Sequence, residues 1–179
     1  PARLLQRLTA DVDALDSPTT RDDLETELAN LKTAYEPEAA LYRLRDGEMM
    51  RIAMRELVRG GRLAQVGDEL TQLAEVILED ALRTARAKTG ERYGEERDPI
   101  AVLGLGKVGG WEMGYGSDLD LLFVFREDRV LDCGMGAAEY FADTAARTIK
   151  ILKEPTRHGI LYDIDSRLRP DGGKGVLAI

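Results

Sequence analysis

Apolar positions in the first ninety residues recur at the three- and four-residue spacing that predicts amphipathic helices. The clearest stripe, in residues 67–88, consists of Leu70, Leu73, Ala74, Ile77, Leu78, Ala81, Leu82 and Ala85. Another, in residues 38–59, consists of Leu41, Leu44, Ile52, Ala53 and Leu57 and ends at Gly60-Gly61. A further helix is predicted after residues 17–20, with Asp22 and Asp23 suited to its first turn. We expect residues 1–90 to be a helical scaffold or linker region.

The pattern changes beyond residues 89–99, a polar stretch that contains Gly90, Gly94 and Pro99 and predicts a boundary. Residues 100–105 predict a buried strand, and residues 118–125 and 160–168 predict two more. Between the last two strands, residues 135–153 predict a helix with Tyr140, Phe141, Ala145, Ile149 and Leu152 on its inner side. We therefore expect an α+β fold, in which a second domain at residues 91–179 holds a small mixed sheet.

Composition excludes several classes of protein. The chain is 44% apolar and 32% charged, which is globular, and its net charge of −8 argues against a nucleic-acid partner. No apolar run approaches a membrane span, and no secretory signal opens the chain. Pro1 in place of an initiator Met, together with the apolar ending at Ile179, suggests a piece of a longer protein.

Few residues are available for nucleophilic catalysis or disulfide bonding. The single cysteine, Cys133, excludes an internal disulfide and fits the reducing cytoplasm. The single histidine, His158, excludes multi-histidine metal sites and argues against Ser-His-Asp chemistry. We interpret His158 as a solvated residue of a turn.

Two aspartates stand at the head of the predicted second strand, in the sequence GSDLDLLFVF of residues 116–125. Because side chains alternate faces along a strand, Asp118 and Asp120 point the same way, with Cα atoms about 6–7 Å apart. Two carboxylates this close repel each other, and a divalent cation is their usual partner. The pair predicts a phosphoryl-transfer site, although Asp-x-Asp alone is a weak signal in a chain with 33 acidic residues.

A glycine-rich stretch separates the first two strands, and its start matches the G-x-G-x-x-G pattern of dinucleotide-binding loops at residues 104–109. A dinucleotide-binding fold would need a crossover helix next, and too few residues follow Gly109 for that helix. We interpret the six glycines between residues 104 and 116 as a phosphate cradle, continued by a short helix. A tight turn that merely requires glycine is the alternative for any single position.

The predicted third strand places charged residues on one face: Asp163, Asp165, Arg167 and Arg169. A half-solvated strand would give the same alternation. Next to an aspartate pair, however, a third carboxylate would hold a metal or accept a proton, and arginines would neutralise phosphate oxygens.

The order of these elements resembles the DNA polymerase β-like nucleotidyltransferases. The segments GLGKVGGWEMGYGSDLDLLF and GILYDIDSRLRPDGGKGVL closely resemble the glutamine synthetase adenylyltransferase family, the bifunctional adenylyltransferase/adenylyl-removing enzymes. The resemblance covers most of residues 40–179. That family carries two nucleotidyltransferase copies, one that adds AMP to glutamine synthetase and one that removes it by phosphorolysis. The segments GGWEMGYGSDLDL and GILYDIDSRLRP are more similar to the C-terminal, adenylylating copy.

The resemblance implies transfer of AMP from ATP, with two Mg²⁺ ions, to a tyrosine of glutamine synthetase. By position, Asp118 and Asp120 would bind both ions, and Asp165 would bind one and orient or deprotonate the tyrosine. The residues implied at the ATP phosphates are Gly104, Gly106, Lys107, Gly109, Gly110 and Ser117. Arg167 and Arg169 would contact phosphate or pack between domains, and Asp163 is interpreted as a solvated residue.

The expected protein partners are glutamine synthetase and a PII-type signalling protein, without nucleic acid or membrane. Three alternatives stay open: the adenylyl-removing copy, a non-catalytic nucleotide-binding regulatory domain, and a dinucleotide-dependent oxidoreductase. The intact Asp118, Asp120 and Asp165 argue against the regulatory domain, and an NAD titration would expose the oxidoreductase.

Overall fold

The computed structural model describes residues 17–96, 100–126, 130–131 and 134–165. Contacts divide the chain into two compact units. The first, here the helical unit, extends to Ile77 and also contains the distant segment Trp111–Gly116. The second, here the sheet unit, contains Leu78–Gly110 and the chain from Ser117 onward. Within the described ranges, no helix combines the length and the apolar character that crossing a bilayer requires.

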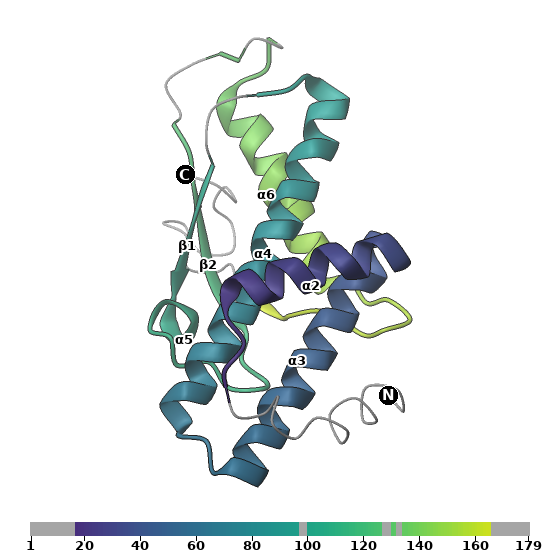
Figure 1. Cartoon of the computed structure of the whole chain (residues 1–179). Helices are drawn as coiled ribbons and strands as arrows, with labels where there is room; N and C mark the ends of the chain where they lie inside the picture. The colour runs from purple at the N-terminus through teal and green to yellow at the C-terminus, as the bar shows by residue number, and fades with distance from the viewer. Residues whose placement is uncertain (1–16, 97–99, 127–129, 132–133, 166–179) are drawn as a thin grey trace. The chain divides into compact units, whose positions relative to one another are not determined.

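Three helices form over the apolar stripes of the first ninety residues: α2 (Arg21–Ala34), α3 (Pro37–Arg59) and α4 (Leu63–Tyr93) (Figure 1). α2 begins where predicted, because Thr20 and Asp23 form a reciprocal capping box. Gly60 ends α3 with a φ of 69°, a conformation that glycine adopts without strain. α4 is longer than the predicted 67–88 segment and continues through the expected boundary at Gly90.

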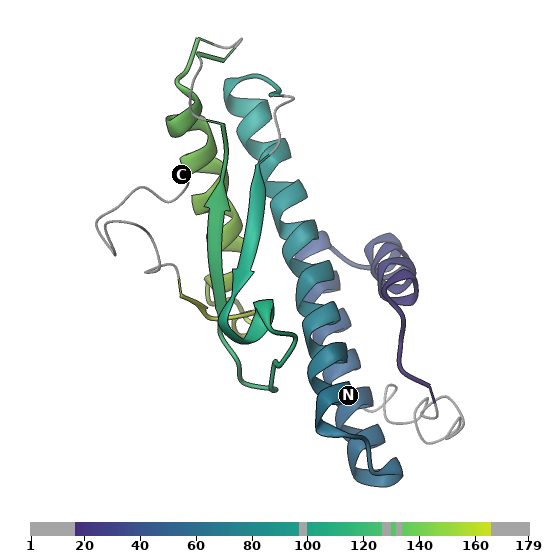
Figure 2. The same cartoon turned by 90° about the vertical axis from the view of Figure 1, so that its left-hand side faces the viewer.

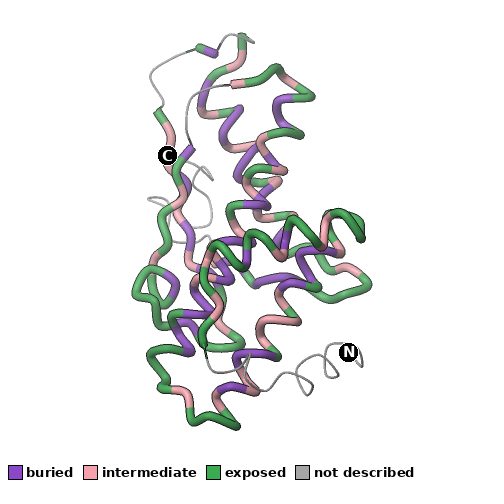
Figure 3. The backbone as a smooth tube through the Cα atoms, viewed as in Figure 1, coloured by how far each residue is buried: buried purple, intermediate pink, exposed green. Residues whose placement is uncertain are grey.

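The core of the helical unit follows the predicted stripes in most positions. The buried members are Leu41, Leu44, Ile52, Leu70, Leu73, Ala74 and Ile77. Figure 3 colours the buried stretches of the chain purple. Leu57 was placed on the stripe wrongly, since 85% of it is exposed. At 3.6 residues per turn it lies about 140° around α3 from Ile52, so it points away from the buried face.

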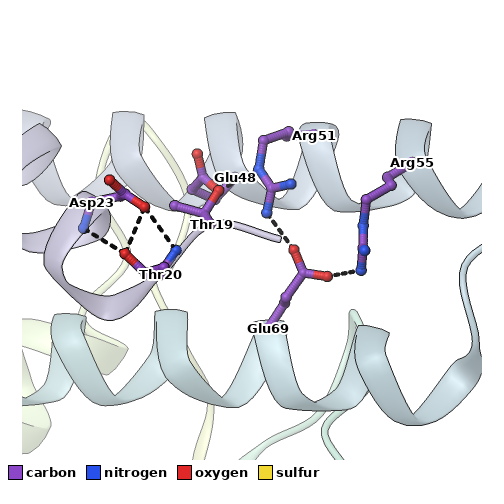
Figure 4. A network of polar contacts seen from close by, with 7 residues as sticks. All are labelled: Thr19, Thr20, Asp23, Glu48, Arg51, Arg55 and Glu69. Atoms are coloured by element: carbon purple, nitrogen blue, oxygen red, sulfur yellow. Dashed lines mark hydrogen bonds and ion pairs between the residues drawn. The ribbon is translucent and has the colours of Figure 1, made fainter. Parts of the chain in front are cut away.

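Buried ion pairs join α3 to the first half of α4. Arg51 and Arg55 of α3 donate to the two carboxylate oxygens of Glu69 on α4 (Figure 4). Glu48 accepts a further bond from Arg51 Nε at 2.7 Å, so two cations face two anions. All three partners of the central bonds are buried, and buried charges are tolerated only when they are paired in this way.

The sheet unit contains three strands among its described residues: β1 (Ala101–Leu105), β2 (Leu119–Val124) and β3 (Ile164–Asp165). β1 pairs antiparallel with β2, as the two long arrows in Figure 2 show, and β2 pairs parallel with β3. The one-turn helix α5 (Gly106–Gly109) follows β1 directly, and α6 (Ala137–Lys153) precedes β3. Helices with a small mixed sheet confirm the predicted α+β class.

The sheet core rests on the middle strand and on α6. β2 alternates as predicted, because Leu119, Leu121 and Phe123 are buried while the residues between them are half-buried. The predicted inner side of α6 also holds, with Tyr140, Phe141, Ala145 and Leu152 buried. Ile149 is only half-buried.

The predicted burial of the first strand was wrong. β1 forms within residues 100–105, but 48% of Leu103 is exposed and no residue of the strand is buried. Among the described strands β1 lies at the edge of the sheet. An apolar run of this length has the same sequence pattern at an edge as in the middle of a sheet.

The predicted third strand is shorter than expected. Only Ile164–Asp165 pairs with β2, and residues 166–168 lie outside the described chain. Residues 160–162 do not pair with β2, and the amides of Leu161 and Tyr162 both donate to Leu152 O at 3.0 Å. They satisfy a carbonyl at the end of α6 that the helix itself leaves without a partner. Asp163 contacts β2 through its carbonyl, which accepts from the Leu119 N–H at 2.9 Å.

Candidate metal centre

Three aspartates converge where β2 and β3 begin. Asp120 and Asp165 stand opposite each other in the parallel pair, and Asp118 precedes Asp120 by two residues. One carboxylate oxygen from each aspartate lies within 4.8 Å of the other two. Asp118 is exposed, whereas Asp120 and Asp165 are half-buried. The structure therefore brings together the three acids that the sequence predicted.

The donor set suits a divalent cation. Carboxylate oxygens are the ligands that Mg²⁺ and Ca²⁺ prefer. Three of them approach one another closely here, and all three aspartates belong to the sheet unit. Like charges at this separation disfavour one another, and a bound cation removes that cost. The arrangement can thus hold a metal ion at the entrance to the β2–β3 pair.

Gly106 supports this centre directly. It has a φ of +54°, in the left-handed region that favours glycine. A Cβ atom on Gly106 would overlap Oδ2 of Asp120, so the backbone of α5 lies against that carboxylate. The glycine is needed both for its backbone conformation and for the room it leaves beside a candidate metal ligand.

The other glycines of the turn allow β1 and α5 to pack against each other. A Cβ atom on Gly109 would overlap the carbonyl oxygen of Gly104, and one on Gly104 would lie 3.2 Å from Val108 Cγ1. α5 is closed by a bond from Gly110 N–H to Gly106 O at 3.0 Å. The expected short helix is confirmed, but it begins inside the glycine run and has one turn, so its dipole is small.

The remaining residues predicted to contact phosphate occupy different settings. Lys107 is exposed on α5, and Gly110 is exposed at its end. Ser117 is half-buried and immediately precedes Asp118. The segment between Gly110 and Ser117 belongs to the helical unit. Arg167 and Arg169 lie outside the described residues, as does Cys133.

Asp163 does not join the three converging acids. Its carboxylate pairs with Lys153 Nζ at 2.7 Å and accepts from the Ile164 N–H at 2.9 Å. The hydrogen bond from Lys153, then that from Ile164, holds the pKa of Asp163 below its ordinary value. The predicted solvated character is confirmed, since Asp163 is exposed, as is His158. The sequence reasoning missed Lys153, whose only signal was its position in the last turn of a helix.

The strand directions exclude a dinucleotide-binding loop. That fold joins the glycine loop to a second, parallel strand through a crossover helix. Here the strand after the loop runs antiparallel to β1, and the helix between them has four residues. The G-x-G-x-x-G match at residues 104–109 therefore has another role.

Comparisons with known proteins match this sequence to one family. The family model described as glutamate-ammonia ligase adenylyltransferase matches residues 2–179. A bifunctional glutamine synthetase adenylyltransferase/adenylyl-removing enzyme from Nitrosococcus oceani is 37% identical over 164 residues, covering 86% of this chain and 17% of that protein. The enzymes of the same name from Bordetella pertussis and Vibrio parahaemolyticus are 34% and 35% identical, over 99% and 93% of this chain.

The chain spans less than a fifth of these relatives, 17% to 19% of their length. The match at residues 2–179 also extends further toward the N-terminus than the predicted resemblance over residues 40–179. The similarity therefore includes the helical unit as well as the sheet unit.

Proposed function

Because the chain belongs to the glutamate-ammonia ligase adenylyltransferase family, we propose that it transfers AMP from ATP to a tyrosine of glutamine synthetase. Glutamate-ammonia ligase is another name for glutamine synthetase, and the name of the relatives includes both adenylylation and its reversal. The observation that carries the proposal is the convergence of Asp118, Asp120 and Asp165 within 4.8 Å. A phosphoryl-transfer site needs such a charge cluster to hold divalent cations.

The three aspartates would hold two Mg²⁺ ions, with Asp118 and Asp120 contacting both and Asp165 contacting one. Bound there, the ions would neutralise the triphosphate and stabilise the attacking and leaving oxygens. Support comes from the half-buried positions of Asp120 and Asp165 and from the absence of a side chain at Gly106. That absence lets the backbone after β1 approach the carboxylate of Asp120.

The glycine turn is assigned to the phosphates of ATP. Backbone N–H groups can approach a phosphate closely where no Cβ intervenes. The residues in this role are Gly104, Gly106, Lys107, Gly109, Gly110 and Ser117. Lys107 is exposed and free to reach a phosphate oxygen, and Arg167 and Arg169 would add positive charge near the third strand.

In the proposed step, the tyrosine oxygen attacks the α-phosphorus of ATP and forms a new O–P bond. The bond from that phosphorus to the oxygen that bridges to the β-phosphorus breaks, and pyrophosphate leaves with the electron pair. Asp165 orients the hydroxyl and accepts its proton, which is needed because the free phenol has a pKa near 10. The protein contributes mainly position and charge neutralisation.

The second candidate is the reverse-acting copy, in which phosphate attacks adenylylated tyrosine and releases ADP. It is favoured by the name of the relatives, which includes an adenylyl-removing activity. The same three acids would serve either direction. The YDIDSRLRPDG segment, at residues 162–172, is our reason for preferring AMP addition.

The wider assignments are part of the same proposal. We assign residues 1–90 to a helical scaffold and residues 91–179 to the nucleotidyltransferase core, because the strands and the converging acids all lie in the second range. The proposed setting is the cytoplasm, with glutamine synthetase as substrate and a PII-type protein as regulator.

The direction of the reaction is tested by offering both forms of the substrate. The chain is incubated with Mg²⁺, α-labelled ATP and unmodified glutamine synthetase, and separately with labelled adenylyl-glutamine synthetase and phosphate. We expect label to enter the unmodified protein. Release of labelled ADP from the adenylylated protein alone would establish the second candidate and contradict the first.

A further inference from the structure

The segment Trp111–Gly116 links the two parts of the candidate metal centre but packs in the other unit. Its ends are bonded to Gly110, which closes α5, and to Ser117, which precedes Asp118. The segment itself groups with the helical unit. Asp118 therefore follows the end of this segment by two residues.

A hydrogen bond ties this segment to α3. The hydroxyl of Tyr115 donates to Glu56 Oε2 at 2.9 Å. Burial and this bond raise the pKa of Tyr115 to about 12, with Arg55 acting in the opposite direction. The hydroxyl therefore remains a donor throughout the physiological pH range. Met113 of the same segment is buried, whereas Tyr115 itself is partly exposed.

A close backbone contact ties the same segment to α4. A Cβ atom on Gly67 would lie 3.0 Å from Trp111 O and 3.3 Å from Glu112 Cα. The helix can therefore approach the segment closely only because this position has no side chain. Glycine is otherwise unfavourable inside a helix by about 1 kcal/mol relative to alanine, so the contact offsets a local cost.

Trp111 adopts a conformation that its own residue type disfavours. Its φ is 58°, in the left-handed region that residues with a Cβ rarely occupy. Such a conformation persists only where the surroundings determine it, and it is commonly found at functional sites. Here the residue stands between the end of α5 and the contact with Gly67.

We propose that α3 and the first half of α4 act as a positioning element for the candidate metal centre, by holding the segment Trp111–Gly116. Glu56 and Gly67 are then positioning residues, since neither is among the converging acids. The inference rests on the proposed function and gives the helical region a role in it. Loosening the segment should displace Asp118 and weaken metal binding without unfolding the chain.

The test compares two pairs of matched variants. Gly67→Ala places a methyl group against the segment, whereas Gly90→Ala changes a glycine of the same helix whose added Cβ would make only ordinary contacts, the nearest at 3.5 Å. Tyr115→Phe removes the hydroxyl that bonds Glu56, and Tyr35→Phe makes the same change at a tyrosine of equal exposure, 41%. Each variant is checked by circular dichroism and thermal unfolding.

Two readouts are measured on the intact 179-residue chain. The first is acrylamide quenching of the single tryptophan, Trp111, which reports whether the segment is held. The second is the dissociation constant for Mn²⁺, used as a probe of the three carboxylates. We expect Gly67→Ala to raise both the quenching and the dissociation constant, the latter about tenfold. Tyr115→Phe should do the same by a smaller factor, because its ring remains.

The possible outcomes separate the inference from the proposed function. Folded Gly67→Ala and Tyr115→Phe variants with wild-type quenching and Mn²⁺ affinity would overturn the inference. Equal effects in Gly90→Ala or Tyr35→Phe would also overturn it, because the segment would then not be the cause. If Gly67→Ala does not fold, Tyr115→Phe decides. A wild-type chain that binds no Mn²⁺ would overturn the proposed function itself and the inference that rests on it.

Discussion

Replacing Gly106 with alanine should separate metal binding from folding. The backbone at this position has a φ of +54°, and an L-residue in the left-handed region costs about 1–2 kcal/mol. The added methyl group would also overlap Oδ2 of Asp120. Because a carboxylate at the end of a short side chain can rotate, the overlap is relieved by moving this group rather than by unfolding the sheet.

The expected magnitudes follow from these two effects. The free energy of unfolding of Gly106→Ala, measured by urea denaturation, should fall by about 1–2 kcal/mol. The Mn²⁺ dissociation constant, measured by calorimetry, should rise by about 10–100-fold, the usual effect of disturbing what holds a metal ligand in place. Gly116→Ala is the control, since its added Cβ meets nothing within 4 Å and the residue lies two positions before Asp118. A Gly106→Ala variant with the Mn²⁺ affinity of Gly116→Ala would refute the reasoning.

Three further predictions concern the charged and polar contacts. Glu69→Ala removes a carboxylate partner from two buried guanidinium groups, of which Arg51 keeps Glu48. It should lower the free energy of unfolding by about 3–5 kcal/mol, and a loss near zero in urea denaturation would contradict the network. Because the pKa of Tyr115 is raised, its hydroxyl stabilises the fold fully below pH 10, and this contribution is lost as pH rises to about 12. Between these pH values, the free energy of unfolding of Tyr115→Phe should therefore fall less steeply with pH than that of wild type. An equal slope in the variant would contradict this prediction. Lys153→Met removes the larger of the two hydrogen bonds that lower the pKa of Asp163 and leaves the bond from the Ile164 N–H. The variant should therefore be less stable than wild type above the ordinary aspartate pKa of about 3.9 and equally stable in stronger acid. A difference in stability that persists in acid would show another origin.

The sequence predicted those features that depend on local periodicity. The stripes around Leu41 and Leu70 identified α3 and α4, and residues 17–20 followed by Asp22 and Asp23 indicated the start of α2. The alternation around Asp118 and Asp120 likewise identified β2 and the direction in which the acids point. These features are local because a helix or a strand repeats every few residues.

Features that depend on which other part of the chain a segment contacts could not be predicted from the sequence. The burial of β1 was wrong because an edge strand and a central strand can share one apolar pattern. The segment at residues 160–162 looked like a strand, but the amides of Leu161 and Tyr162 bond to Leu152 O at the end of α6, a contact that depends on a carbonyl outside the segment. Leu57 was misplaced because its angle around α3 matters more than its spacing from the previous apolar residue.

The sequence predicted the three aspartates of the candidate site but not the residues that hold them in place. Asp118, Asp120 and Asp165 were identified by their positions on two strands, and the parallel pairing brings them together. The requirement for Gly106 beside Asp120 depends on how β1 and α5 turn in three dimensions. The bond from Tyr115 to Glu56 joins residues far apart in the chain, with no sequence signal in either segment.

The central claim is that the three converging acids support AMP transfer, and Asp120→Asn tests it most directly. The substitution keeps the size of the side chain and removes one of the charges that would hold the metal ions. Transfer of label from α-labelled ATP to glutamine synthetase is measured for wild type and variant in the presence of Mg²⁺, with circular dichroism confirming the fold. We expect the variant to be folded and its transfer activity to be abolished. Near-normal Mg²⁺-dependent transfer by Asp120→Asn would contradict the central claim.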